Sequence, residues 1–294
     1  MGEEGGMMQE LYVRYKGLLF TLAYQLTGSV SDAEDVVQDV FLKLYDVKWQ
    51  SLVEPKAYLC KMVTNRCRDL FKSARKRREQ YFGQWLPEPL PTADDETYGS
   101  IVQGELLSYA MLVLLERLSI TERTVFVLRE SLGFEYADIA VLVGKSELNC
   151  RKLMSRARGK MGITLDEPVN SDAASEEWVR RFLAALEQDN VKLVVSMLAK
   201  DVVLVSDGGG KASAAVHPIE SRDYVARFLF GLVRKIPHYE GDIRIELRDI
   251  NGQTGLVVYS GLSIETVALM HVERNSICNL YFIRNPDKLK HLLK

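Results

Sequence analysis

Apolar residues recur every three or four positions over residues 8 to 82, which is the period of an amphipathic helix. Gly28 is expected to end a first helix. Ser31 to Glu34 has the pattern of a capping box that begins a second helix, and Pro55 suits the first turn of a third. The apolar stripes of the second and third helices comprise Ala33, Val36, Val37, Val40, Phe41 and Leu44, and Leu59, Met62, Val63, Leu70 and Phe71.

A second helical segment covers residues 102 to 164. Thr121 is expected to cap one of its helices, which Gly133 stops. A short helix, a turn at Gly144 and a helix capped by Ser146 follow, with a basic surface on the last. This order of elements is typical of a helix-turn-helix.

Two stretches break the helical pattern. Residues 83 to 101 begin with the proline-rich run 85–91, which cannot continue a helix and favours polyproline II conformation. Residues 168 to 174 form a second polar stretch. Both are expected to be linkers between folded segments.

Beyond residue 174 the hydrophobic period changes from helical to alternating. The pattern predicts helices at residues 178–186 and 224–233. It predicts strands at residues 202–206, 242–250, 255–260, 264–273 and 277–283. Helices followed by an antiparallel run of strands indicate an α+β domain over residues 174–294. The fold class expected is therefore multidomain, with two all-α segments (a helical bundle over 8–82 and a helix-turn-helix over 102–164) followed by this domain.

Length and composition agree with a soluble protein of two or three domains, since the chain has 294 residues, 47% hydrophobic and 27% charged. It contains no run of 18 apolar residues and no signal-peptide pattern, so we expect a cytoplasmic protein without membrane contact. Four cysteines lack a C-x-x-C pair and four histidines lack ligand spacing. No metal or cofactor is expected.

The net charge of −2 hides two basic patches. Residues 61 to 81 hold eight Lys or Arg residues against two acids, and residues 145 to 160 hold six against one. A phosphate responds to the local electrostatic field rather than to the net charge of the whole chain. These basic patches therefore indicate nucleic-acid binding although the net charge is negative.

One face of the third helix carries a row of polar and cationic residues, spaced four, three, four and three positions apart. This row comprises Lys61, Asn65, Arg68, Lys72 and Arg75. The alternative interpretation is that this row is simply a solvent-exposed helix surface, as many basic runs are. The near absence of acids and the presence of Asn65 favour DNA, because the cations neutralise phosphates while an amide can hydrogen-bond a base edge.

The last helix of the helix-turn-helix is expected to present a second DNA-binding face. Its outward residues are expected to be Asn149, Arg151, Lys152, Ser155, Arg156 and Arg158. The N-terminal residues of a recognition helix reach base edges in the major groove, and later cations hold phosphates.

These motifs resemble the extracytoplasmic-function (ECF) sigma factors of bacterial RNA polymerase. Residues 31–41 are similar to the family's polymerase-binding helix, and the run from Ala57 to Asp69 to its −10-reading helix. Residues 136–140 and 155–158 are similar to the signature of sigma domain 4, which reads the −35 element. Two departures are a glutamate at position 135, a weaker cap than Ser or Thr, and Asn149-Cys150 in place of the usual Thr-Val.

The rest of the chain resembles the subgroup with a fused C-terminal SnoaL-like domain, the SigJ type. The resemblance rests on Trp85-Leu86-Pro87-Glu88-Pro89, Asp207-Gly208-Gly209-Gly210-Lys211 and Asn285-Pro286-Asp287-Lys288-Leu289. It implies that the loop at 207–211 docks on the helical half, with Trp85 as the anchor, and that the cone-shaped domain regulates the sigma domains. A phosphate-binding loop and a plain hairpin tip are the other readings of the glycines.

The resemblance implies that Asp32, Asp35, Gln38 and Asp39 face the polymerase clamp. The partners implied are core RNA polymerase (clamp and flap) and promoter DNA, and the domain pocket leaves room for an unidentified small ligand. Asp207, His217 and His271 are the candidates for catalysis, but their spacing shows no acid/base pair, so no enzyme is expected. The alternatives are a pocket enzyme (isomerase-like or cyclase-like) fused to a DNA-binding module, and a DNA-binding regulator that never contacts polymerase.

Overall fold

The computed structural model describes residues 2–44, 54–92, 105–163, 174–235 and 242–293, except for the side chains of residues 2–7 and 72–79. The chain forms two compact units. Of the described residues, the first unit comprises 2–44, 54–79, 105–107 and 111–163, and the second comprises 80–92, 108–110, 174–235 and 242–293. The predicted order, helical segments followed by an α+β domain, is confirmed.

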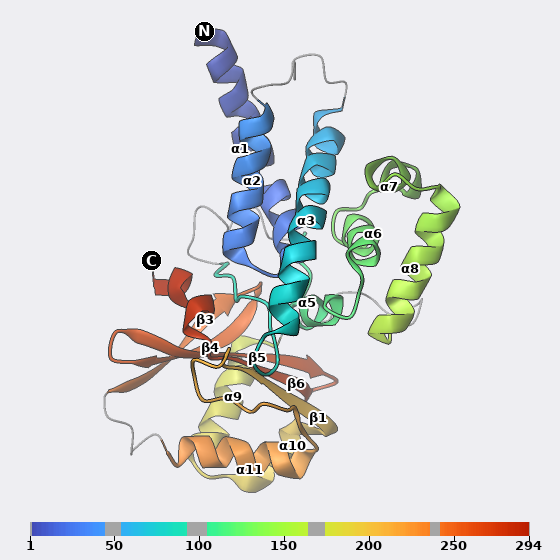
Figure 1. Ribbon diagram of the computed structural model, residues 1–294. Coiled ribbons are helices and arrows are strands. Elements are labelled where there is room, and N and C mark those ends of the chain that lie inside the picture. The colour runs from blue at the N-terminus through green and yellow to red at the C-terminus, as the bar shows by residue number, and fades with distance from the viewer. Residues whose placement is uncertain (1, 45–53, 93–104, 164–173, 236–241, 294) are drawn as a thin grey trace. The chain divides into compact units, whose positions relative to one another are not determined.

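The first unit is helical (Figure 1). Its helices are α1 (Gly2–Thr27), α2 (Val30–Leu44), α3 (Pro55–Glu79), α5 (Tyr109–Leu115), α6 (Ile120–Glu130), α7 (Tyr136–Val143) and α8 (Glu147–Met161), although the first two residues of α5 group with the second unit. Helices α1, α2 and α3 pack on one another, and α6, α7 and α8 do the same. Helices α6 and α7 also contact α3, so both helical groups form one body.

Two helix starts differ from the sequence predictions. Helix α2 begins one residue before Ser31, and the amide of Asp32 donates to the hydroxyl of Ser29 at 3.2 Å, so Ser29 takes the capping role predicted for Ser31. Helix α6 is capped by Ser119, which forms a capping box with Glu122, and not by Thr121. In each case the capping hydroxyl lies two residues before the predicted one. The apolar residues of both helices still face the core.

The helix-turn-helix forms as predicted. Helix α7 ends at Gly144, whose φ of 65° is left-handed, the conformation that glycine adopts without strain. Ser146 then caps α8 by accepting a hydrogen bond from the amide of Asn149 at 3.3 Å. The side chain of Glu135, at the cap of α7, makes no capping hydrogen bond.

A buried arginine joins the two helical groups of the first unit. Arg123 on α6 donates to the carbonyl of Leu26 at the end of α1 at 2.9 Å, and to that of Leu115 at 2.7 Å. One of its nitrogens also lies 2.8 Å from a carboxylate oxygen of Glu116. Its guanidinium carbon lies 5.4 Å from the ring centre of Phe71 on α3.

The second unit contains a six-stranded sheet in the order β2-β1-β6-β5-β4-β3. Its elements are α9 (Glu176–Glu187), α10 (Val191–Met197), β1 (Leu198–Asp207), β2 (Ile219–Glu220), α11 (Arg222–Val233), β3 (Ile243–Ile250), β4 (Gln253–Ser260), β5 (Ser263–Glu273), β6 (Ser276–Ile283), and the 3-10 turns η3 (Pro286–Lys288) and η4 (Lys290–Leu293). Strands β3 to β6 form the predicted antiparallel run. Strand β1 pairs with β6 in parallel, so the sheet is mixed.

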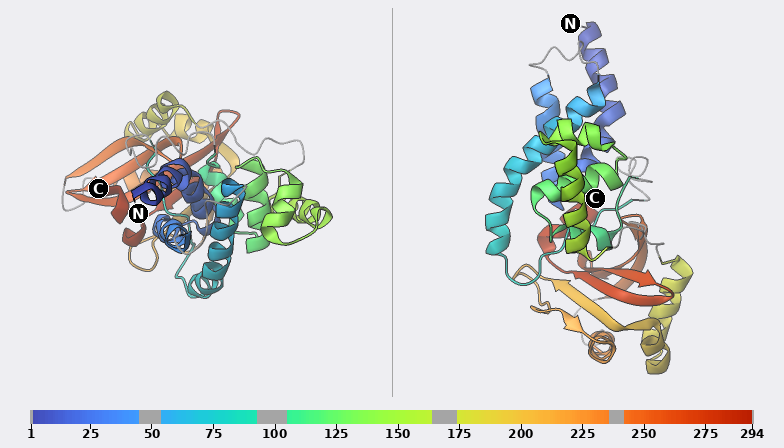
Figure 2. Two further views of the ribbon diagram at one scale, coloured as in Figure 1. Left: turned by 90° about the horizontal axis from the view of Figure 1, so that it is seen from above. Right: turned by 90° about the vertical axis from the view of Figure 1, so that its right-hand side faces the viewer.

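The two faces of this sheet are buried differently. Helices α9, α10 and α11 cover one face, as Figure 1 and the right-hand view of Figure 2 show, over a core that includes Phe182, Leu229 and Leu280. Alternate strand residues point to the opposite face. That face is also buried, at Val257, Val267, Leu269, Tyr281 and Ile283.

Candidate functional site

The predicted row on α3 has its described members at the surface. Lys61 and Arg68 are exposed and Asn65 is half-buried. The amide oxygen of Asn65 accepts a hydrogen bond from Arg68 Nη2 at 2.9 Å, which orients both side chains. The opposite face of α3 is buried at Leu59, Cys60, Val63 and Cys67. Lys72 and Arg75 lie in α3, but their side chains are outside the described part of the structure.

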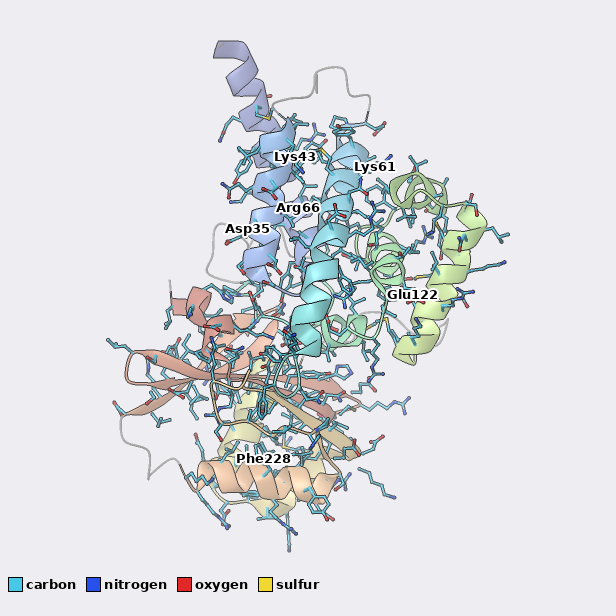
Figure 3. The ribbon with its side chains drawn as sticks, in the orientation of Figure 1. Asp35, Lys43, Lys61, Arg66, Glu122 and Phe228 are labelled. Carbon is cyan, nitrogen blue, oxygen red and sulfur yellow. The ribbon has the colours of Figure 1, made fainter. Side chains whose placement is uncertain are left out.

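A small groove of about 230 Å³ lies beside Asn65, between α2 and α3. It is lined by Asp39, Val40, Lys43, Met62, Asn65, Arg66 and Asp69. Arg66, labelled on α3 in Figure 3, donates through its Nε to a carboxylate oxygen of Asp39 on α2 at 2.7 Å, which ties the two helices together. The groove therefore offers an amide and both charge signs close to the cationic row.

The acidic residues of α2 divide into two groups. Asp35 and Gln38 are exposed, as the predicted polymerase-facing surface requires. Asp32 is half-buried, and Asp39 is held by its ion pair with Arg66. Asp39 therefore faces α3 in part. The sequence predicts only that it faces the polymerase clamp, together with the other acidic residues of this helix.

Helix α8 exposes most of the residues predicted for it. Asn149, Lys152, Ser155 and Arg156 are exposed. Arg151 is exposed too, but pairs with Glu147 at 2.7 Å and lies 4.3 Å from the ring centre of Tyr136.

The expectation for Arg158 is corrected, since its side chain is only 11% exposed and pairs with Glu130 on α6 at 3.0 Å. Arg158 therefore joins α8 to α6 within the helix-turn-helix. Lys160 similarly pairs with Glu122 at 2.7 Å.

In the second unit the three motifs converge on the carboxylate of Asp207, which is 0% exposed. One oxygen accepts from the Tyr81 hydroxyl at 2.6 Å. The other accepts from the Leu86 amide at 2.8 Å and from Lys288 Nζ at 2.7 Å. We call Tyr81, Leu86, Asp207, Asn285 and Lys288 the clasp.

Lys288 and Tyr81 complete the clasp. Lys288 is 5% exposed, and its ammonium also donates to the carbonyl of Leu86 and lies 3.9 Å from the ring centre of Trp85. The Tyr81 hydroxyl accepts from the side-chain amide of Asn285 at 2.7 Å. Burial, followed by the hydrogen bond to Asp207, raises the pKa of Tyr81 above its ordinary value, so the phenol keeps its proton and donates it to the carboxylate.

The glycines after Asp207 permit a close approach to the clasp. Gly209 has a φ of 58°, and a Cβ there would collide with the Asn285 amide and lie 2.8 Å from the Tyr81 hydroxyl. Gly210 also has a positive φ, and Phe82 lies against it. Lys211 pairs with Asp287. The glycines therefore serve as a docking loop for residues 81 and 82, within the second unit.

The described part of the predicted linker lies along the sheet. Pro87 accepts from the Tyr109 hydroxyl at 2.7 Å, and Pro89 contacts His291 Nε2 at 2.6 Å through its carbonyl. Leu90 exchanges hydrogen bonds with Asn251 at 2.9 and 2.7 Å, beyond the end of β3. Glu88 is half-buried. Residues 80–92 therefore span from β1 to β3 and belong to the fold of the second unit.

The three candidates for catalysis do not come together. Asp207 is held in the clasp, His217 is exposed, and His271 contacts Glu273 at 2.8 Å. Across the described ranges no three His, Cys, Asp or Glu side chains gather as a metal site would require. In the same ranges no helix combines the length and apolarity needed to cross a membrane.

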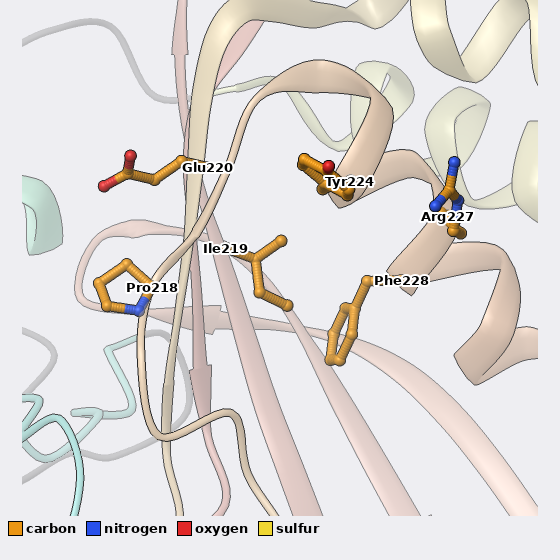
Figure 4. A pocket seen from close by; sticks show the side chains of 6 residues that line it. All are labelled: Pro218, Ile219, Glu220, Tyr224, Arg227 and Phe228. Atoms are coloured by element: carbon orange, nitrogen blue, oxygen red, sulfur yellow. The ribbon is translucent and has the colours of Figure 1, made fainter.

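Two hollows lie in the described part of the second unit, at places that the sequence did not predict. A cavity of about 430 Å³ lies between α11 and the sheet, with Glu265 and Arg284 among its mostly apolar lining residues. A more open hollow is lined by Pro218, Ile219, Glu220, Tyr224, Arg227 and Phe228 (Figure 4). Phe228 contributes to both. Alternation along β5 would place Glu265 on the other face of the sheet, so its position could not be read from the sequence.

Comparison with known proteins supports the sigma-factor assignment for both helical groups. Residues 11–77 match the family model Sigma-70 region 2, and residues 108–161 match Sigma-70, region 4. The ECF RNA polymerase sigma factor SigJ of Mycobacterium tuberculosis is 36% identical over 92% of this chain and 89% of its own length. The probable ECF RNA polymerase sigma factor SigI of the same species is 28% identical over 63% of this chain and 64% of its own.

The similarity extends to structure. The crystal structure of SigJ from Mycobacterium tuberculosis matches with a TM-score of 0.77 and 32% sequence identity, covering 94% of this chain and 96% of that one. The match therefore includes the C-terminal α+β domain as well as both sigma regions. From the motifs, the fold and this similarity along almost its whole length, the chain belongs to the ECF RNA polymerase sigma factors of the SigJ type, which carry a C-terminal SnoaL-like domain.

Proposed function

We propose that this chain directs core RNA polymerase to promoters by reading the −10 element with α3 and the −35 element with α8, and that its second unit modulates this activity through the clasp. The observation that carries the proposal is the outer face of α3, where Lys61, Asn65 and Arg68 lie opposite a buried face. Membership of the sigma-factor family supports core polymerase and promoter DNA as the partners.

At the −10 element, α3 holds one strand of opened DNA. Lys61 and Arg68 neutralise phosphates, and Asn65 hydrogen-bonds the edge of an extruded base. Extrusion costs a few kcal/mol, which contacts in a pocket offset. The groove of about 230 Å³ beside Asn65 provides a place for that base.

At the −35 element, the exposed side of α8 enters the major groove. Asn149 and Lys152, near its capped N-terminus, reach base edges, while Arg156 holds a phosphate. Arg158 supports this surface from behind through its pair with Glu130.

Asp35 and Gln38 are the residues of α2 proposed to face the polymerase clamp, since both are exposed on the side away from the helical core. No bond chemistry is assigned to this chain, because the polymerase forms the phosphodiester bonds.

The clasp gives the second unit a route to modulate the sigma regions. It fixes residues 81–86, which directly follow α3 in the chain, to the end of β1 and to η3. A change in the clasp therefore acts on the segment that leads from the −10-reading helix to the helix-turn-helix. This supports regulation by the protein's own domain.

Salt dependence of promoter binding tests the α3 face. The DNA is a promoter fork selected from a random library by the reconstituted holoenzyme. Replacing Lys61 and Arg68 together by Gln removes two phosphate contacts, so the log–log slope of affinity against salt should fall by about 1.4 to 1.8. The matched control replaces the exposed Arg181 and Lys192 of the second unit by Gln and should keep the slope. An unchanged slope in the first variant would show that this face does not bind DNA.

Run-off transcription tests modulation by the clasp. Asp207→Asn should change transcript yield from the selected promoter at least threefold relative to wild type, whereas Asp201→Asn, at an exposed position on the same strand, should leave it unchanged. Equal yields from both variants and wild type, with equal binding to core polymerase, would refute the regulatory part of the proposal.

A further inference from the structure

The cavity of about 430 Å³ in the second unit has the size and lining of a small-molecule site. Leu256, Ala268 and Phe282 are neighbours in the strand register and form its floor. Helix α11 forms the opposite wall through Phe228, Leu229, Leu232 and Val233. The interior is therefore largely aliphatic and aromatic.

One end of the cavity is polar. Arg284 follows β6, and its Nε donates to the hydroxyl of Thr266 on β5 at 3.2 Å. Another of its nitrogens donates to the carbonyl of Ser213. These bonds hold the guanidinium in place, while its third nitrogen, Nη2, has no hydrogen-bond partner among the described residues. A fixed guanidinium with an N–H edge that no described residue occupies is a binding group for a carboxylate.

A β-bulge brings Glu265 to the same cavity. The register of β4 and β5 pairs Val258 with Thr266 but Tyr259 with Ile264, so Glu265 is the extra residue. Such bulges redirect a side chain and are frequent next to binding sites. Glu265 and Arg284 both line the cavity, yet no ion pair joins them within the described structure. Both charged groups can therefore interact with a ligand in the cavity.

We propose that this cavity binds an aliphatic carboxylate, with its chain against α11 and the sheet floor and its carboxylate on Arg284 and Thr266. Two cations, Arg284 and Lys235, line the cavity against one acid, Glu265, so the net charge favours an anionic head group. Glu265 lies at the same cavity and selects for a hydroxyl or other hydrogen-bond donor on the ligand. This inference does not depend on the proposed role of the clasp.

Isothermal titration calorimetry of the full chain with three ten-carbon probes tests the head-group chemistry. Decanoate, decanol and decyltrimethylammonium share the aliphatic chain and differ in charge. Decanoate, titrated below its micelle concentration, should bind with one site per chain and at least tenfold more tightly than either of the others. Equal affinity for decanol and decanoate would overturn the carboxylate assignment, and absence of decanoate binding would overturn the site.

Variants locate the site. Arg284→Gln should weaken decanoate binding at least tenfold, and Arg284→Lys should restore most of it. The matched control is Arg227→Gln, because Arg227 lies on the same helix as Phe228 but borders the open hollow of Figure 4, and its replacement should leave affinity unchanged.

A filling variant separates binding from folding. Val258→Phe adds volume to the wall of the cavity and should abolish decanoate binding while the melting temperature stays within a few degrees of wild type. Wild-type affinity in Arg284→Gln, or in a folded Val258→Phe protein, would show that decanoate binds elsewhere.

Discussion

Asp207 is a fully buried carboxylate at the end of β1 in the second unit. Burying a carboxylate is costly unless hydrogen bonds and an opposite charge compensate. Asp207 receives both, from Tyr81, the Leu86 amide and Lys288. Lys288 is in turn satisfied by the Leu86 carbonyl and the ring of Trp85. Removal of either charge therefore leaves the other one buried without its counter-ion.

Asp207→Asn should destabilise the second unit by about 3 to 5 kcal/mol, because it leaves the ammonium of Lys288 buried without its counter-ion. Urea denaturation followed by tryptophan fluorescence measures this, since Trp85 lies against Lys288. Asp201→Asn, at the exposed end of β1, should change stability by less than about 0.5 kcal/mol. The double variant Asp207→Asn with Lys288→Met should be more stable than Asp207→Asn alone. A single variant as stable as wild type would show that the pair contributes nothing.

Two neighbouring glycines offer a second test at this scale. Gly209→Ala and Gly210→Ala both place a side chain at positive φ, which costs roughly 1 to 2 kcal/mol. At Gly209 the new Cβ also meets the Asn285 amide and the Tyr81 hydroxyl, whereas at Gly210 it meets Phe82 at 3.3 Å. Gly209→Ala should therefore lower the urea midpoint clearly more than Gly210→Ala. Equal losses would mean that the loop does not press on the clasp.

At the scale of elements, α3 is defined by its two faces. Its inner face buries Cys60 and Cys67, and its outer face carries Lys61 and Arg68. Burial raises the pKa of Cys60 to about 12 and raises the pKa of Cys67 as well. Both therefore remain thiols at neutral pH, and thiols are poor nucleophiles.

Alkylation checks the orientation of α3. With iodoacetamide at pH 8, Cys60 and Cys67 should stay unmodified in the folded protein, and half-buried Cys278 should react first. All four cysteines should react after denaturation. Peptide mass spectrometry identifies the modified residues. Rapid alkylation of Cys60 or Cys67 in the folded protein would mean that α3 is rotated and that the cationic row does not face outward.

Sequence patterns predicted the elements better than their details. Within the described residues, the period of apolar residues located the long helices and five of the strands, because packing of a stripe dominates element formation. The caps at Ser29 and Ser119 were missed because a hydroxyl two residues later fits the same local pattern. The bulge at Glu265 and the parallel pairing of β1 with β6 depend on strand register, which a single sequence does not specify. The inward turn of Arg158 depends on Glu130, 28 residues away.

At the scale of the whole molecule, the division into units does not follow the order of the chain. Residues 80–92, between the two sigma regions in sequence, fold with the C-terminal domain. The three motifs at 85–89, 207–211 and 285–289 are thus parts of one structure rather than separate signatures. In this SigJ-type sigma factor, the described segment between the two sigma regions is therefore part of the domain that is proposed to regulate them.

Run-off transcription with core polymerase on the selected promoter tests the central claim, that α3 presents a DNA-reading face, most directly. The samples are wild type, the variant with Lys61 and Arg68 replaced by Glu, and the control with Arg181 and Lys192 replaced by Glu. Wild type and control should give equal amounts of specific transcript, and the α3 variant at least tenfold less, with equal binding of all three to core polymerase. A wild-type protein that directs no specific transcript, or an α3 variant that transcribes like wild type, would contradict the account.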